Sequence, residues 1–126
     1  MPHYSRFSRV VVDVPAETHD AELAFWQGAL GTAFHQAKKF PEYHWGELPG
    51  DGNAMLLQRL GDGPARVHID IHTTDRAAEV ARLQGLGATL VDDGERWAVM
   101  RDPAGLVFCV VPDPRLDASN ATEWTD

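Results

Sequence analysis

Three ionisable residues stand at alternate positions of one short segment: His68, Asp70 and His72. In an extended strand, alternate residues project to the same face, so two imidazoles and a carboxylate would share one surface here. A histidine titrates near neutral pH and serves as a general acid, a general base or a metal ligand. A carboxylate beside it orients the ring or joins it at a metal. We therefore predict His68 and His72 as catalytic candidates and Asp70 as a ligand-binding residue.

A second strand, near the N-terminus, carries ionisable groups in the same alternating pattern. Over residues 7–14, Arg9 and Asp13 share one face, as the histidines do over residues 66–73. The opposite faces are apolar and are expected to pack on helices; their residues are Val10, Val12, Val14, Val67, Ile69 and Ile71. If the sheet curves, the polar faces of both strands line a pocket, which is the usual shape of a small-molecule site.

These two strands open two similar halves of the chain, at about residues 7–60 and 66–112, joined by the Gly-rich segment 61–64. In each half, a strand is followed by a helix, a Leu-Gly helix stop and three more strand-like runs. The later runs are residues 33–40, 43–48, 53–59, 88–92, 95–101 and 105–111. The pattern predicts two tandem βαβββ modules in a single α+β domain over residues 1–126.

Capping and turn residues set the expected limits of the helices and loops. The first helix is expected at residues 18–30, with Thr18 or Asp20 as its N-cap and Gly31 as its end. The second is expected at residues 75–86, with Asp75 as its N-cap and Gly87 as its end. Tight turns are expected at residues 49–52 and 102–105, which contain Pro and Gly. The polar tail 113–126 is expected either to fray or to lie along the body through Trp124.

Composition excludes several classes of protein. The chain of 126 residues is 44% hydrophobic and has a formal net charge of -8, which argues against nucleic acid as a partner. No apolar run is long enough to cross a membrane, so no membrane partner is expected. Cys109 is the only cysteine, so no internal disulfide can form and a cytoplasmic setting is expected.

The order of these segments resembles the vicinal oxygen chelate superfamily, and its small glyoxalase-like domain proteins in particular. The superfamily includes glyoxalase I, bleomycin-resistance proteins and extradiol dioxygenases. The matching segments are residues 10–15, 25–31, 67–72, 86–89 and 102–105. The resemblance implies a curved, cup-like mixed sheet with the helices outside, and a homodimer.

The resemblance also implies four metal-ligand positions, typically a His and a Glu in each half. In this sequence the four positions fall on Arg9, Gln58, His68 and Cys109. An arginine has no lone pair to give a metal. We therefore favour no metal and no other cofactor. If a divalent ion (Zn, Ni, Fe or Mn) is bound, we expect Gln58, His68 and Cys109 to hold it, or else the run of His68, Asp70 and His72.

Three functions remain open from the sequence. The first is a metal-independent protein that binds a small molecule, as drug-sequestering relatives do. Its polar lining would be Arg9, Asp13, Gln58, His68 and Asp70, with Trp45 and Trp97 stacking on the ligand and further aromatic lining from Phe40, Tyr43 and Phe108. The second is a lyase, isomerase or dioxygenase that uses His68 or His72 as base, with Arg9 holding an anionic oxygen. The third is an interaction module whose cavity is vestigial.

Overall fold

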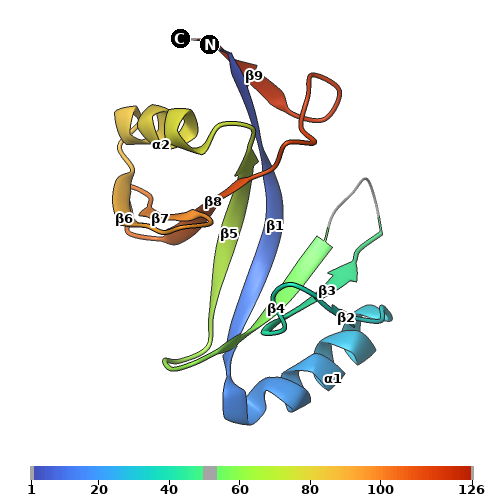
Figure 1. The fold of residues 1–126 in the computed structure, drawn as a ribbon. Helices are drawn as coiled ribbons and strands as arrows, with labels where there is room; N and C mark the ends of the chain where they lie inside the picture. Colours follow the sequence, from blue (N-terminus) through green and yellow to red (C-terminus); the bar gives the residue numbers. More distant parts are fainter. Residues whose placement is uncertain (1, 50–53, 126) are drawn as a thin grey trace. The chain divides into compact units, whose positions relative to one another are not determined.

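The computed structural model describes residues 2–49 and 54–125. These residues form nine β-strands and two α-helices (Figure 1). In chain order they are β1 (His3–Pro15), α1 (His19–Leu30), β2 (His35–Gln36), β3 (Tyr43–Glu47), β4 (Ala54–Leu60), β5 (Arg66–Thr73), α2 (Arg76–Gly85), β6 (Thr89–Asp93), β7 (Ala98–Arg101), β8 (Val107–Pro112) and β9 (Thr122–Trp124). The turn predicted at residues 49–52 lies almost wholly outside the described residues.

The chain divides into two compact units, one of Arg9–His68 and one of Met1–Ser8 with Ile69–Asp126. In the unit Arg9–His68 the strand order is β2-β3-β4-β1, with β1 and β4 parallel and the other pairs antiparallel. Its core lies on the side of the sheet that α1 covers and is built from Val14, Phe34, Met55 and Leu57, with Val12, Leu23, Trp26 and Leu48 packed against it. Val12 and Val14 meet this core as predicted, but Val10 is 37% exposed, so the expectation that it packs on a helix is wrong.

The other unit repeats the arrangement with the order β5-β8-β7-β6, in which β5 and β8 are parallel. Its core contains Val80, Leu83, Ala98, Met100 and Val110, with Ile71, Ala88, Leu90 and Phe108 packed against it. Phe108 thus lies on the helix side, and its predicted place in the polar pocket is wrong. The expectation that Val67 and Ile69 pack on helices is also wrong, since they are 61% and 42% exposed.

The mixed α+β fold of two βαβββ repeats is confirmed, but the strand expected over residues 33–40 shrinks to β2. After β2 the backbone turns: the Ala37 N–H donates to the Tyr43 carbonyl, and the Tyr43 N–H donates to the Phe40 carbonyl. Pro41 lies inside this turn and has no N–H to give a strand partner. The remaining predicted strands are present: three are shorter than expected, three keep the expected length, and β1 is longer, since it begins at His3.

The helix limits follow the predicted signals with one exception. Asp75 caps α2 by accepting from the Ala78 N–H, and Gly31 ends α1 with a φ of 65°. Thr18 precedes α1 but makes no capping bond; its hydroxyl donates to the Pro15 carbonyl. A single 3-10 turn, Ala16–Thr18, leads into α1 instead. Among the described residues, no helix is long and apolar enough to span a membrane.

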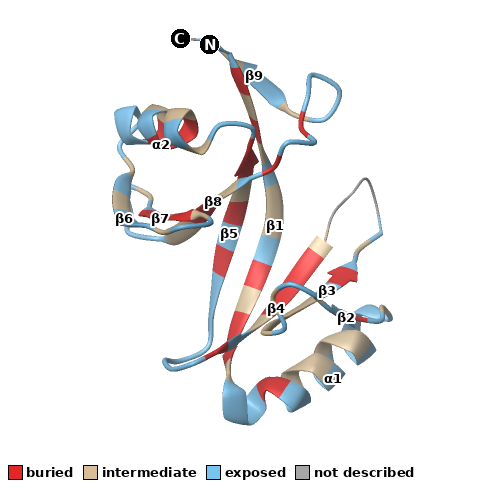
Figure 2. Cartoon of the chain, in the orientation of Figure 1, coloured by how far each residue is buried: buried red, intermediate tan, exposed pale blue. Residues whose placement is uncertain are grey.

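The C-terminal tail docks and does not fray. Its strand β9 pairs with the start of β1, and the Trp124 indole N–H donates to Ser5 Oγ at 2.8 Å. The Arg82 guanidinium lies 3.8 Å from the centre of the Trp124 ring. The same Arg82 binds Glu79, which is fully buried and also bonded to His3 at 2.8 Å. Figure 2 shows the buried residues of α2 and of the N-terminal part of β1 in red.

Candidate functional site

The polar face of β5 is the protected face of the strand. His68, Asp70 and His72 are only 9%, 8% and 5% exposed, whereas the intervening Val67 and Ile69 are largely in solvent. The prediction that the three ionisable residues share a face is confirmed. Buried ionisable groups require partners, because an isolated charge in a low-dielectric interior is costly. The partners of the two histidines come from distant parts of the sequence.

His68 is held by Asp13 of β1, within the unit Arg9–His68. His68 Nδ1 lies 2.7 Å from Asp13 Oδ2, and Asp13 is 2% exposed. Arg66 stands further off, with its Nε 3.7 Å from the same oxygen. The second oxygen of Asp13, Oδ1, is buried and has no hydrogen-bond partner among the described residues. The negative charge of this carboxylate is therefore directed mainly at His68.

Gln58 lies beside this pair. In the parallel register of β1 and β4, Asp13 is opposite Gln58, so both side chains project to the same face. Three of the predicted binding residues, Asp13, Gln58 and His68, are thus brought together. Arg9 is four residues before Asp13 on β1, which puts it about 13 Å away along the strand.

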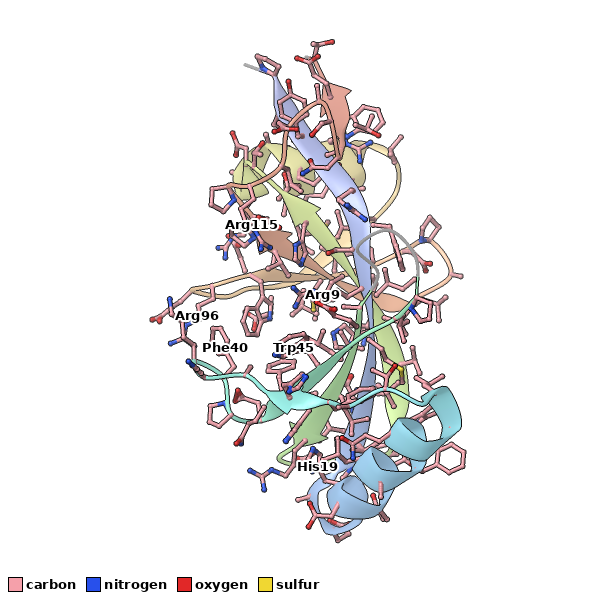
Figure 3. The ribbon with its side chains drawn as sticks, turned by 90° about the vertical axis from the view of Figure 1, so that its right-hand side faces the viewer. Arg9, His19, Phe40, Trp45, Arg96 and Arg115 are labelled. Atoms are coloured by element: carbon pink, nitrogen blue, oxygen red, sulfur yellow. The ribbon has the colours of Figure 1, made fainter. Side chains whose placement is uncertain are left out.

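His72 is held by Asp113, within the other unit. His72 Nδ1 lies 2.8 Å from Asp113 Oδ2, and the Arg115 side chain, labelled in Figure 3, binds both oxygens of Asp113 at 2.9 and 3.1 Å. The hydrogen bond from Arg115, and next that from His72, hold the pKa of Asp113 far below its usual range, against the opposing effect of burial. Sequence reasoning missed Asp113 and Arg115. The signal was the parallel pairing of β5 with β8, which brings the residue after β8 next to the end of β5.

Asp70 and Cys109 are direct register partners of β5 and β8, and each is 8% exposed. Their ligand atoms lie within 4.8 Å of each other. His68 precedes Asp70 by two residues on β5, so a nitrogen, an oxygen and a sulfur donor occur on two paired strands. This donor set shares His68 and Cys109 with the four positions that the resemblance implies, and Asp70 is its third member. Those four do not fit a metal centre, because Arg9 cannot ligate.

Of the predicted aromatic residues, Tyr43 and Trp45 lie on the sheet face that Gln58 and Asp13 share, because Tyr43 is opposite Gln58 in the register of β3 and β4. Trp45 is 36% exposed and its ring centre is 5.0 Å from that of His35. Trp97 lines a surface hollow of about 400 Å³ at the β6–β7 hairpin, together with Asp92, Gly94, Glu95, Arg96 and Val99. The hollow has two carboxylates and one guanidinium, so its lining is net acidic.

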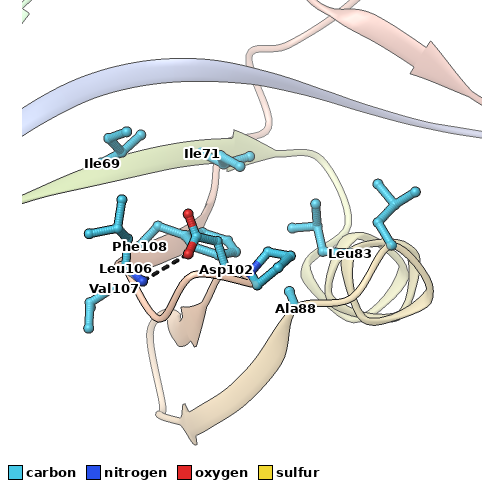
Figure 4. Close-up of a pocket in the computed structure, with 10 residues that line it drawn as sticks. Ile69, Ile71, Leu83, Ala88, Asp102, Leu106, Val107 and Phe108 are labelled. Atoms are coloured by element: carbon cyan, nitrogen blue, oxygen red, sulfur yellow. Dashed lines mark hydrogen bonds between the residues drawn. The ribbon is translucent and has the colours of Figure 1, made fainter.

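A second pocket, of about 280 Å³, was not predicted. It lies between β5, β8 and α2 (Figure 4), and its lining includes Ile69, Leu83, Leu86, Ala88, Leu106 and Phe108. Its one carboxylate, on Asp102, accepts from the Ala104 and Leu106 N–H groups and so stabilises the predicted turn at residues 102–105. The pocket is almost entirely apolar and offers no general acid or base.

Comparisons with known proteins agree with this architecture. A family described as a glyoxalase-like domain matches residues 9–111. Among solved structures, methylmalonyl-CoA epimerase from Mycobacterium tuberculosis is similar with a TM-score of 0.59 and 16% identity, over 86% of this chain and 89% of that chain. A methylmalonyl-CoA epimerase in complex with methylmalonyl-CoA and NH4+ is similar with a TM-score of 0.60 and 14% identity. The match covers 90% of this chain and 98% of that chain. The 2,2',3-trihydroxybiphenyl 1,2-dioxygenase from Sphingomonas wittichii strain RW1 is similar with a TM-score of 0.55 and 10% identity, over 90% of this chain and 42% of that chain.

At these identities the likeness extends to the fold and no further. No curated protein matches the chain significantly in sequence. The chemistry of the site must therefore be argued from its own residues.

Proposed function

Because the chain belongs to the glyoxalase-like domain family, we propose that it is an enzyme that binds a small carbonyl compound and moves a proton on it through His68. The observation that carries this proposal is the buried pair of Asp13 and His68. A protein that only sequesters a ligand has no need of an imidazole held by a buried carboxylate. An acid–base catalyst does, because the carboxylate fixes the tautomer and stabilises the imidazolium that forms.

The proton transfer uses the ring nitrogen that faces away from Asp13. With Nδ1 bonded to Asp13, His68 Nε2 is the atom that takes a proton from the carbon next to the carbonyl. The electron pair of the broken C–H bond moves into the enolate, whose oxygen becomes negative. The imidazolium then returns a proton to the same carbon, so the broken C–H bond is re-formed and no co-reactant is consumed.

Gln58 is the residue that would stabilise the enolate. Its side-chain amide has two N–H donors and shares a face with Asp13, beside His68. Donors aimed at the oxygen where charge develops are a large contribution to catalysis. Arg9, about 13 Å further along β1, would instead bind a carboxylate or phosphate at the far end of a longer ligand.

The substrate class we propose is an acyl thioester or a similar compound with an acidic C–H bond. One protein of similar fold was solved in complex with methylmalonyl-CoA, which is a compound of this class. The alternative is a metal-assisted lyase, isomerase or dioxygenase. In that case His68, Asp70 and Cys109 would be the donors, and the ion would polarise the carbonyl.

Deuterium exchange tests the proposal without knowledge of the product. The full chain is incubated in D₂O with a panel of 2-methyl-branched and dicarboxylic acyl-CoA compounds, and uptake of deuterium next to the carbonyl is followed by mass spectrometry. We expect exchange with at least one compound, a loss of about a hundredfold or more in His68→Ala, and no change in His35→Ala, which alters an exposed histidine of β2. Exchange with none of the panel, or equal exchange in His68→Ala, would overturn the proposal.

A second candidate function is sequestration of a cationic aromatic molecule. It is favoured by the net acidic hollow that Trp97 lines with Asp92 and Glu95. Aromatic rings and carboxylates together attract organic cations. The expected result is a rise in Tm with aromatic cations that disappears in Trp97→Ala and persists in His68→Ala; protection that is insensitive to Trp97→Ala would contradict this candidate.

A further inference from the structure

Two histidines that the proposed function does not use meet beneath α1. His19 is the first residue of α1 (Figure 3) and is 5% exposed, while His44 lies in β3. Their ring centres are 5.1 Å apart and their planes are inclined by 50°. His44 is opposite Leu57 of the α1-side core in the register of β3 and β4, so its side chain projects toward α1. Both residues belong to the unit Arg9–His68.

Each of these rings has a nitrogen without a partner. His19 Nε2 and His44 Nδ1 are buried and make no hydrogen bond to any part of the chain that the structure describes. The Oε1 atom of Glu42, two residues before His44, is likewise buried and has no hydrogen-bond partner among the described residues. Buried polar atoms of folded proteins are nearly always hydrogen-bonded, so an unsatisfied nitrogen on each of two rings in contact requires a reason.

The contact of His19 with Asp20 bears on which of its ring nitrogens has the lone pair. His19 Nδ1 lies 3.5 Å from Asp20 Oδ1, which favours the proton on Nδ1 and leaves the lone pair on Nε2. Neutral imidazole is the form that ligates metals.

We propose that His19 and His44 form a site for a divalent transition-metal ion of the zinc, nickel or copper class. Two imidazoles bound to one tetrahedral ion at about 2.0–2.1 Å have ring centres about 5 Å apart, which matches the separation in this structure. Imidazole donors suit this class of ions. Among the described residues, Glu42 is not within ligand distance of both rings. The remaining positions are taken by water, or by Glu42 after its side chain rotates.

Zinc titration of the full chain tests the site. The His68→Ala protein, which lacks the candidate catalytic histidine, is stripped with chelator and titrated with Zn²⁺ by calorimetry. We expect one ion per chain, with affinity reduced at least tenfold by a further His19→Gln or His44→Gln. The matched control is His35→Gln, an exposed histidine, which leaves the affinity unchanged. Absence of zinc binding in His68→Ala, or an affinity that neither further substitution reduces, would overturn the proposal.

A second measurement on the unsubstituted chain covers the case in which a buried substitution unfolds the protein. Long-range ¹H–¹⁵N NMR spectra of the imidazoles are recorded with and without saturating Zn²⁺. We expect the His19 Nε2 and His44 Nδ1 signals to move and the His35 signals to stay. If those two nitrogens do not respond to zinc, the site does not exist.

Discussion

Each unit buries a histidine of β5 against a carboxylate, yet these two pairs differ in which group balances the charge of the carboxylate. Asp113 gives both oxygens to Arg115 and shares one with His72. Asp13 has a guanidinium only at 3.7 Å and keeps one oxygen buried and unpartnered. The charge of Asp113 is therefore neutralised by Arg115, whereas the charge of Asp13 acts on the imidazole of His68.

We propose that this difference separates a structural histidine, His72, from a reactive one, His68. An imidazole becomes a better base when a carboxylate stabilises its protonated form, and that effect weakens when a cation already balances the carboxylate. The His72 pair also joins β5 to the segment after β8, because the Asp113 N–H donates to the Thr73 carbonyl at 2.7 Å. We therefore assign catalysis to His68 and expect His72 to serve mainly stability.

The largest expected difference is between the two histidine truncations. His68→Ala should lower the deuterium-exchange rate by about a hundredfold or more, because a general base contributes at least this much. His72→Ala should lower it less than tenfold once folding is verified by circular dichroism. Equal losses in exchange rate, measured in parallel, would remove the distinction between the pairs.

Substitutions of the two carboxylates should change the deuterium-exchange rate in the same order as the histidine substitutions, but by a smaller amount. Asp13→Asn preserves shape and removes the charge, and we expect it to reduce exchange by about tenfold to a hundredfold, as for partners that orient a functional histidine. Asp113→Asn should have little effect on exchange. A fall in exchange in Asp113→Asn that matches the one in Asp13→Asn would show that the Arg115 contact does not matter for the chemistry.

Stability should depend on pH through Asp113. Its pKa is lowered in the folded chain, so its contribution is complete above its unfolded pKa of about 4 and is lost as the pH falls further. Asp113→Asn should lower the free energy of unfolding by about 1–3 kcal/mol at pH 7. The gap to the unsubstituted chain should narrow below about pH 4, as followed by urea unfolding. A gap of constant size at all pH values would contradict this role.

The smallest effect is expected from removing the arginine that distinguishes the pairs. Arg115 is largely in solvent, so Arg115→Ala should change stability by less than about 1 kcal/mol. The pKa of Asp113 should nevertheless rise toward its ordinary range, because its main hydrogen-bond donor is gone. NMR titration of the Asp113 carboxyl carbon measures this pKa directly. An unchanged pKa would show that Arg115 is not what lowers it.

The sequence by itself determined the repeat, the fold and the face of β5 that carries the ionisable groups. Strand alternation and helix-stop signals are local, so they can be read within a few residues of His68 or Gly31. The same local reasoning failed for Val67 and Ile69, because an apolar alternation indicates a face and not whether another element covers it.

Only the tertiary structure decided which carboxylate each histidine meets. His68 and Asp13 are 55 positions apart in the sequence, and His72 and Asp113 are 41 apart. Those pairings depend on how β1, β4, β5 and β8 are ordered and in what register they bond. The polar side chains are too few to specify that order; it follows from burying the apolar faces, and the partners of the histidines follow from it.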